Sequence, residues 1–156
     1  MEKLLLSLCI PTYKRPHLLL KAIESMIDSA ADYLEQVQIV ITDDSTDNTN
    51  EWVIDKVKDK IKHLKYIKNH SNLGIDGNIL HAIDSSDGEF AWVLGEDDLV
   101  CQGAVKNFMS IMNKSDYAFI CSNYSYVAAD QRKMLKENVI GLSRDREVKQ
   151  IGRAHV

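Results

Sequence analysis

Short apolar runs alternate along the chain with longer segments in which apolar residues recur at helical spacing. The first run ends at Pro11, as expected of a strand buried on both faces of a sheet, and the second is rich in β-branched side chains and ends at Asp43 and Asp44. The runs lie at residues 4–10, 37–42, 64–68, 89–94 and 117–121. Strands that alternate with helices predict βαβ units, right-handed crossovers and a mostly parallel sheet, so we expect an α/β fold.

The segments between the runs carry apolar residues three and four positions apart, as expected of helices with one side against a core. The third of these segments, near residues 75–83, is expected to turn Ile79, Leu80 and Ile83 inward. Trp52 and Trp92 lie within apolar patterns and are expected in the core. Beyond Tyr126 the chain is more polar, and no period is clear.

Composition points to a globular domain with one core. The chain has 156 residues, of which 45% are hydrophobic and 27% charged, and a net charge of −4. These values argue against a disordered chain and against a protein that attracts nucleic acid by net positive charge. Cys9, Cys101 and Cys121 form no CxxC pair, which favours a reducing compartment. Cys9 and Cys121 fall in apolar runs and are expected to be buried.

No stretch reaches the roughly 18 consecutive apolar residues that a membrane span needs. The sequence therefore predicts a cytoplasmic protein without a transmembrane segment. Peripheral association with the inner face of the cell membrane is compatible with this prediction.

Polar residues follow each of the first four runs. Ligands of open parallel sheets bind beyond the carboxyl ends of the strands, so we expect these four segments to converge on one rim. The rim carries five carboxylates, at Asp43, Asp44, Glu96, Asp97 and Asp98. Such a cluster suits Mg²⁺ or Mn²⁺, with substrate phosphates and water completing the metal's ligands. For either acidic group alone, a role only in turns and helix caps is an equally good interpretation.

The rim lacks the glycine-rich sequences of the common phosphate-binding loops. No G-x-G-x-x-G follows the first run and no Walker sequence is present, which disfavours dinucleotide dehydrogenases and P-loop nucleotidases. A diphosphate bridged by a metal fits better. Tyr13 offers a ring for base stacking and Arg15 a cation for an anion, although a surface role is as good an interpretation for each alone.

Four motifs now stand in one order: Pro11-Thr12-Tyr13-Lys14-Arg15, then Thr42-Asp43-Asp44-Ser45-Thr46-Asp47-Asn48-Thr49, then Asn72-Leu73-Gly74 with Asn78, then Glu96-Asp97-Asp98. Over residues 4–126 they resemble the family-2 glycosyltransferases. The resemblance implies a Rossmann-like GT-A nucleotide-diphospho-sugar transferase fold, with three layers (α/β/α) around a mostly parallel sheet, truncated here at the C-terminus. It also implies an inverting, metal-dependent glycosyltransferase of surface polysaccharide or glycan biosynthesis.

The resemblance also implies a role for each of the predicted rim residues. It implies a nucleotide-diphosphate-sugar donor with its base near Pro11, Thr12, Tyr13 and Asp43, and with Asp44 supporting the loop. Asn72, Gly74 and Asn78 would form a wall beside the nucleotide and sugar. Arg15, Glu96 and Asp97 complete the donor-binding set, with Asp97 at the ribose, and Asp98 would hold Mn²⁺ or Mg²⁺ at the diphosphate.

The implied reaction transfers a sugar to a hydroxyl of a glycan or lipid-linked acceptor. The cation stabilises the departing diphosphate, and a carboxylate removes the proton of the attacking hydroxyl. No catalytic base is assigned, because the later carboxylates Asp130, Glu137, Asp145 and Glu147 have no recognisable context. We expect the base downstream of this chain, so the chain by itself is not expected to be a complete enzyme.

Two positions depart from the family pattern. Gly95 stands where many members carry the first Asp of an Asp-x-Asp triplet, and Gly77 stands where many carry Arg before the Asn. The first departure leaves the number of protein ligands to the metal open. The second removes one phosphate contact, for which Lys14 and Arg15 are the candidate replacements.

Two other functions stay open at this point. One is a non-catalytic module that binds a nucleotide sugar. The other is a phosphoacceptor signalling domain, which also places acidic residues at strand ends, but no lysine follows the fifth apolar run as that class requires. The histidines His17, His63, His70 and His81 show no ligand spacing and are expected to be surface or cap groups.

The chain is expected to divide into three parts. Residues 1–126 form the nucleotide-sugar-binding domain, and residues 127–150 begin an incomplete acceptor-side region. One coding of the last six residues, ATCGGAAGAGCACACGTC, matches a common sequencing adapter. We therefore predict that residues 151–156 are not native, the alternative being an ordinary frayed terminus.

Overall fold

The computed structural model describes residues 3–112, 117–128, 134–137 and 139–141. The chain divides into two compact units, residues 1–115 and 116–156. The first unit contains every residue that the sequence assigned to a donor site. The division of function at residues 126 and 150 stays a prediction.

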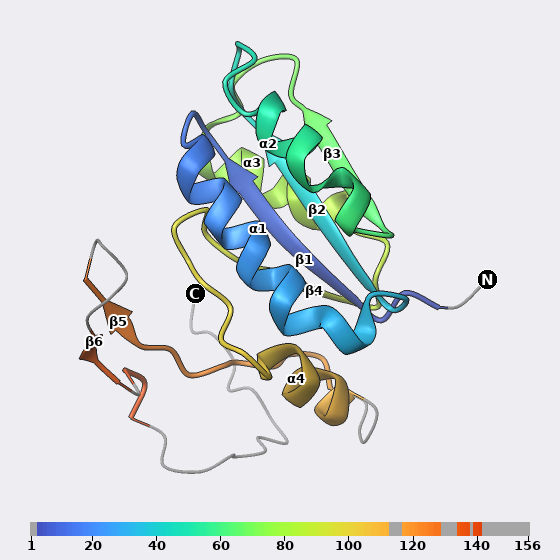
Figure 1. Ribbon diagram of the computed structural model, residues 1–156, viewed down its shortest axis with the longest axis vertical. Coiled ribbons are helices and arrows are strands. Elements are labelled where there is room, and N and C mark those ends of the chain that lie inside the picture. Colours follow the sequence, from blue (N-terminus) through green and yellow to red (C-terminus); the bar gives the residue numbers. More distant parts are fainter. Residues whose placement is uncertain (1–2, 113–116, 129–133, 138, 142–156) are drawn as a thin grey trace, which may run out of the picture. The chain divides into compact units, whose positions relative to one another are not determined.

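A four-stranded parallel sheet forms the centre of the first unit (Figure 1). Its strands are β1 (Leu6–Thr12), β2 (Val37–Asp43), β3 (Leu64–Lys68) and β4 (Phe90–Val93), in the order β3-β2-β1-β4. β1 and β2 pair from Leu6 with Val37 to Thr12 with Asp43, so these two strands end side by side. The first four predicted strands are confirmed, with ends shifted by no more than two residues.

Helices cover both faces of the sheet (Figure 1). The connections from β1 to β2 and from β2 to β3 run in one direction, so right-handed crossovers place α1 (Pro16–Ala30) and α2 (Glu51–Val57) on one face. The connection from β3 to β4 runs back past β1, which places α3 (Gly74–Asp84) on the other face. The 3₁₀ turns η1 (Ala31–Tyr33) and η2 (Lys58–Lys60) follow α1 and α2, and α4 (Ala104–Met112) packs on the α1 side. The predicted α/β/α layering is confirmed.

The two faces of the sheet bury unequal cores. On the α1 side, alternate residues of β1 and β2 pack against α1, α2 and α4: Leu6, Leu8, Ile10, Val37, Ile39 and Ile41. On the α3 side the core consists of Cys9, Val40 and Ala82, with Val93 against them. Buried polar groups fill part of this side, where the Ser7 hydroxyl donates to Gln38 Oε1 at 2.8 Å.

Three apolar positions differ from the prediction. Leu80 and Ile83 were expected to face inward but are 61% and 39% exposed, whereas Asn78 and Ala82 face the sheet. Among the described elements α3 is the helix on this face, so only its strand-facing side is buried. Trp52 was expected in the core but is 42% exposed, with its ring 5.5 Å from that of His17. Trp92 packs against the core as predicted.

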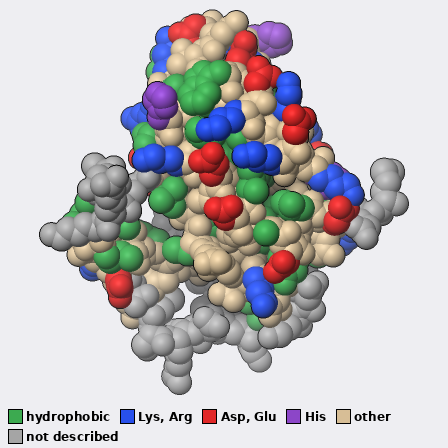
Figure 2. Space-filling model, viewed as in Figure 1, with side chains coloured by type: hydrophobic (Ala, Val, Ile, Leu, Met, Phe, Trp, Pro, Cys, Tyr) green, Lys and Arg blue, Asp and Glu red, His purple; other side chains and the backbone are tan. Residues whose placement is uncertain are grey.

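Charges of both signs are interspersed over α1 and α2 (Figure 2). Lys56 Nζ of α2 lies 3.8 Å from Glu24 Oε1 of α1, an ion pair that links the two helices. Among the described residues, positive and negative side chains therefore offset one another over these helices, in agreement with the nearly balanced composition. In the part of the chain that the structure describes, no helix combines the length and the hydrophobicity of a membrane span.

The second unit contains two short antiparallel strands, β5 (Tyr126–Val127) and β6 (Met134–Lys136). The strand predicted at residues 117–121 is wrong, because these residues form no strand, and Cys121 is exposed rather than buried. A strand needs a neighbour for its N–H and C=O groups, and an apolar run does not by itself provide one. The predictions for Asp130, Asp145, Glu147 and residues 151–156 lie outside the described residues.

Candidate functional site

The candidate site lies at the carboxyl ends of the strands. The chain passes from β1 to β2 and β3 on one side and then returns to add β4 on the other side of β1. Crevices between strands open where the order of strands reverses in this way, which here is between β1 and β4. The loops after these two strands hold Tyr13, Arg15, Asp97 and Asp98, and all four side chains are exposed.

Glu96 connects these two loops. Its carboxylate accepts hydrogen bonds from the Thr12 hydroxyl and from the Tyr13 N–H at 3.1 Å. Arg15 Nε lies 3.5 Å from the other carboxylate oxygen. Burial raises the pKa of Glu96, against the lowering effect of the Thr12 and Tyr13 hydrogen bonds and of the Arg15 charge. A carboxylate that follows β4 is therefore held inside the loop that follows β1.

Asp97 and Asp98 point outward from a tight turn. The turn is closed by the Asp98 N–H, which donates to the Gly95 carbonyl at 3.1 Å, and by the Gly95 N–H, which donates to Asp98 Oδ2 at 2.9 Å. A Cβ atom on Gly95 would lie 2.8 Å from Asp97 Oδ1 and 3.0 Å from Asp98 Oδ2. A side chain at position 95 would therefore displace the Asp97 and Asp98 carboxylates from these positions.

The donor set fits a divalent cation that shares its coordination with substrate. No group of three His, Cys, Asp or Glu side chains that could hold a metal occurs within the described residues. Asp97 and Asp98 together offer hard oxygen ligands at an exposed turn. Mg²⁺ commonly takes one or two protein carboxylates and completes its shell with phosphate oxygens and water. The residues present suit that mode of binding.

The acidic turn is anchored to α1 through two serines one helical turn apart. Ser25 Oγ accepts the Val100 N–H at 3.0 Å. Ser29 Oγ donates to the Cys101 carbonyl at 2.9 Å and accepts the Val105 N–H at 3.2 Å. These bonds fix the chain that leaves the turn and enters α4.

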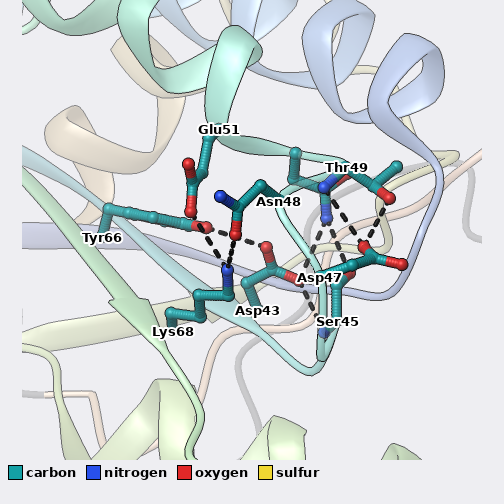
Figure 3. Close-up of polar contacts among 9 residues, drawn as sticks. Asp43, Ser45, Asp47, Asn48, Thr49, Glu51, Tyr66 and Lys68 are labelled. Atoms are coloured by element: carbon teal, nitrogen blue, oxygen red, sulfur yellow. Dashed lines mark hydrogen bonds and ion pairs between the residues drawn. The ribbon is translucent and has the colours of Figure 1, made fainter.

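Asp43 is wholly buried at the end of β2 (Figure 3). Its Oδ1 accepts from the Ser45 N–H at 2.8 Å and from Asn50 Nδ2 at 3.0 Å, and its Oδ2 accepts from the Tyr66 hydroxyl at 2.8 Å. Burial, and then Asp43, raise the pKa of Tyr66, because both favour the neutral phenol. A carboxylate has about four acceptor positions, so three protein donors leave one position on Oδ2.

A second set of contacts ties β3 to the loop after β2 (Figure 3). Lys68 Nζ donates to Asn48 Oδ1 at 2.6 Å and lies 3.0 Å from Glu51 Oε1. Side chains of β3 therefore tie this edge strand to β2 and the loop after it: Lys68 contacts Asn48 and Glu51, and Tyr66 donates to Asp43.

Asp44 holds the loop that follows β3. Its Oδ1 accepts from Asn69 Nδ2 at 2.6 Å, and both carboxylate oxygens lie 3.1 Å from the Leu73 nitrogen. Asn72 Oδ1 accepts the Gly74 N–H at 2.9 Å, and Gly74 has a φ of 74°, which favours glycine. Asn72 and Gly74 are exposed on this loop, whereas Asp44 is buried beneath it.

Asn78 is buried where β1 and β2 end. Its amide donates to the Thr12 carbonyl at 3.3 Å and to the Thr42 carbonyl at 3.1 Å, and its oxygen accepts from Asn69 at 3.0 Å. Asn69 Oδ1 lies 2.8 Å from His81 Nδ1. Since both amide hydrogens of Asn69 already have acceptors, the His81 ring is the donor in that bond.

Lys14 joins the loops after β1 and β2. Its N–H donates to Ser45 Oγ at 3.0 Å and its ammonium lies 3.0 Å from Asp47. Lys14 has a φ of 56°, the left-handed conformation that costs a non-glycine residue free energy. The hydrogen bonds from Thr49, followed by that from Lys14, lower the pKa of Asp47 to about 2, and Asp47 in turn raises the pKa of Lys14.

The predicted site residues therefore fall into two groups. Tyr13, Arg15, Asn72, Gly74, Asp97 and Asp98 are exposed on the rim, and Pro11 is half-buried beside them. Thr12, Asp43, Asp44, Asn78 and Glu96 are buried, and the last four bond to loops and strand ends of the protein. Sequence reasoning missed Ser45, Asn50, Tyr66 and Asn69, which bond to Asp43 or Asp44. For Asn69 the signal was its position directly after a predicted strand.

Comparisons with known proteins identify the family and the fold of this chain. The sequence profile described as Glycosyl transferase family 2 matches residues 7–154. A relative from Campylobacter jejuni, GalNAc(5)-diNAcBac-PP-undecaprenol beta-1,3-glucosyltransferase, is 29% identical over 119 residues, or 76% of this chain and 37% of the relative. The chain spans about a third to a half of the length of the curated relatives that it matches.

Two solved structures share the fold. S. aureus TarS 1-349 in complex with UDP-GlcNAc has a TM-score of 0.61 at 23% identity, over 70% of this chain and 31% of that one. The mannosyltransferase PcManGT from Pyrobaculum calidifontis, in complex with GDP-Man and Mn²⁺, has a TM-score of 0.60 at 16% identity, over 74% of this chain and 34% of that protein. Since the family profile matches well over half of the sequence, this chain belongs to glycosyltransferase family 2, and it has the GT-A fold.

Proposed function

We propose that this chain forms the nucleotide-sugar donor site of an inverting, metal-dependent glycosyltransferase. The observation that carries the proposal is the pairing of two exposed loops at one crevice: Tyr13 and Arg15 after β1, and Asp97 and Asp98 after β4. An aromatic ring, a guanidinium and two carboxylates match the parts of a nucleoside diphosphate with its cation.

Each exposed group takes one part of the donor. The Tyr13 ring lies against the base, together with Pro11 and Thr12, and the Arg15 guanidinium pairs with phosphate oxygens. Asp97 faces the ribose and Asp98 holds the cation. Bound Mn²⁺ or Mg²⁺ supplies Lewis-acid stabilisation of the leaving diphosphate. Asn72 and Gly74 line the side of the site next to α3.

The buried groups act mainly on the shape of the site. Asp44 and Asn78 hold the loop after β3 and the ends of β1 and β2. Asp43 is wholly buried and its three donors come from the protein, so it serves the base-binding side of the site by holding the loop after β2 in place.

We propose a glycan or lipid-linked acceptor for this site. The Campylobacter relative is named for an undecaprenol-linked acceptor, which supports a lipid-linked or glycan acceptor and surface polysaccharide assembly. An acceptor hydroxyl would attack the sugar from the side opposite the diphosphate and lose its proton to a carboxylate outside the described residues. Such an acceptor would bring the protein to the inner face of the membrane.

Calorimetric titration with UDP, GDP, CDP and dTDP, each with Mn²⁺ and with EDTA, tests the donor site. We expect Mn²⁺ to tighten binding of at least one nucleotide by roughly tenfold or more, because the diphosphate completes the metal's ligands. Asp98→Ala should abolish this coupling. Asp32→Ala, at an exposed position on η1 beyond the opposite end of the sheet, is the matched control. Equal affinities with and without Mn²⁺ for every nucleotide would refute the proposal.

A further inference from the structure

Glu96 differs from its two acidic neighbours in where its side chain lies. Asp97 and Asp98 are exposed, whereas Glu96 is only 8% exposed. The donors that its carboxylate receives come from the last residue of β1, Thr12, and from Tyr13 and Arg15 in the loop that follows. A buried carboxylate is costly unless hydrogen bonds and charges compensate it, and here one continuous segment, residues 12–15, provides the compensation.

The three donors between them contact both oxygens of the Glu96 carboxylate. The Thr12 hydroxyl and the Tyr13 N–H both reach Oε2, and the Arg15 guanidinium stands 3.5 Å from Oε1. Tyr13 and Arg15 are also the exposed groups of this loop that the donor would meet. The contacts therefore hold the backbone of Tyr13, and Glu96 directs the Arg15 side chain together with Asp97, whose Oδ2 lies 3.9 Å from Arg15 Nη1.

Glu96 is equally part of the acidic turn. The Asp98 N–H donates to the Gly95 carbonyl across it, and the Gly95 N–H donates to Asp98 Oδ2. Residues 95–98 thus form one closed turn in which a displacement of Glu96 displaces Asp98. The serine contacts of Val100 and Cys101 hold the far side of this turn to α1.

We propose that Glu96 is a positioning residue that couples the nucleotide-binding loop to the metal-binding turn, touching neither ligand itself. This inference rests on the proposed function, and it replaces the direct donor contact that the sequence predicted for Glu96. Metal held by Asp98 orders the turn, the turn holds Glu96, and Glu96 holds Tyr13 and Arg15 in the geometry that binds nucleotide. The same contacts act in reverse, because coupling between two sites is reciprocal.

The test uses Glu96→Gln, which keeps the size of the side chain. The amide oxygen still accepts from Thr12 or Tyr13, but an NH₂ group then faces the Arg15 guanidinium, and neither can accept from the other. Glu89→Gln is the matched control, because Glu89 is an exposed glutamate at the opposite end of β4 that pairs with Lys3. The probe is whichever of UDP, GDP, CDP and dTDP binds wild type most tightly with Mn²⁺.

The readout is the coupling factor, the nucleotide Kd in EDTA divided by the Kd in Mn²⁺. We expect Glu96→Gln to lower this factor by roughly fivefold or more, the lower end of typical coupling, and Glu89→Gln to leave it at the wild-type value. A residue that only stabilised the fold would lower the melting temperature and leave the factor unchanged. A folded Glu96→Gln protein with the wild-type factor overturns the inference.

A second variant covers the case in which Glu96→Gln does not fold. Thr12→Val removes one donor to Glu96 and keeps the carboxylate, so it should also lower the coupling factor, and an unchanged factor overturns the inference. The two proposals fail in different ways. A wild-type protein without coupling refutes the proposed function, whereas wild-type coupling that survives both variants refutes only the role of Glu96.

Discussion

Replacing Tyr66 by phenylalanine removes a single oxygen atom from the edge strand β3. That hydroxyl donates to Asp43 Oδ2 at 2.8 Å, and Asp43 has 0% of its surface exposed. The other two donors to Asp43 both reach Oδ1, so the substitution leaves Oδ2 without a donor among the described residues. The ring of Tyr66 packs against the main core, and a phenyl ring keeps that packing.

The expected cost follows from the charge of the acceptor. A hydrogen bond to a charged group contributes about 1.5–3 kcal/mol, and the burial of Asp43 prevents water from replacing the lost donor. We therefore expect Tyr66→Phe to lower the free energy of unfolding by roughly 1.5–3 kcal/mol at neutral pH. Urea titrations followed by circular dichroism measure this difference.

The same bond predicts a dependence on alkaline pH. Burial and Asp43 raise the pKa of Tyr66 above its ordinary value of 10.0, so the folded state retains the phenolic proton more firmly than the unfolded state. The resulting stability is fully present below about pH 10 and is lost as the pH rises through the folded-state pKa. Wild type should therefore lose stability above about pH 10 more steeply than Tyr66→Phe.

Tyr33→Phe is the control, since Tyr33 is half-buried against the same core and its hydroxyl bonds to no described residue. Its free energy of unfolding should stay within about 0.5 kcal/mol of wild type. If Tyr66→Phe falls within the same limit, or if its alkaline profile matches that of wild type, the Tyr66 hydroxyl does not stabilise the buried Asp43 and the reasoning fails.

Substitutions at three further positions test the structure of the first unit, each by urea unfolding. Lys14→Gly should be more stable than Lys14→Ala by roughly 0.5–1 kcal/mol, because both lose the Asp47 pair and only glycine adopts the positive φ freely; equal stabilities would contradict the strain. Gly88→Ala should cost about 1–3 kcal/mol, since its Cβ would lie 2.7 Å from the Ser7 nitrogen, and a neutral result would show that the backbone yields easily. Asn78→Ala should cost roughly 1–3 kcal/mol, because it removes a buried donor to the Thr12 and Thr42 carbonyls and the acceptor of Asn69 Nδ2, while the Thr12 carbonyl keeps its bond from the Asp44 N–H; a loss below about 0.5 kcal/mol would mean that water replaces the amide.

Much of the first unit could be predicted from periodicity. Four strands and the helices between them occur where the apolar pattern places them, because a period of two and a period of 3.6 are properties of local sequence. The prediction failed where burial depends on a neighbour. Leu80 has the spacing of a core residue but stands on the side of α3 away from the sheet, and the apolar run at residues 117–121 forms no strand.

The residues of the candidate site could be predicted from the sequence, but the directions of their side chains could not. The sequence alone determined which residues come to the rim, because each follows a strand and parallel strands end together, and its motifs determined the family. Only the tertiary structure decided which of the five carboxylates face outward. Asp43, Asp44 and Glu96 are turned inward by donors on other strands and loops, the Thr12 hydroxyl being 84 positions from Glu96, whereas Asp97 and Asp98 remain exposed. Five carboxylates look alike in the sequence, and the direction of each depends on donors that only folding brings within hydrogen-bonding distance.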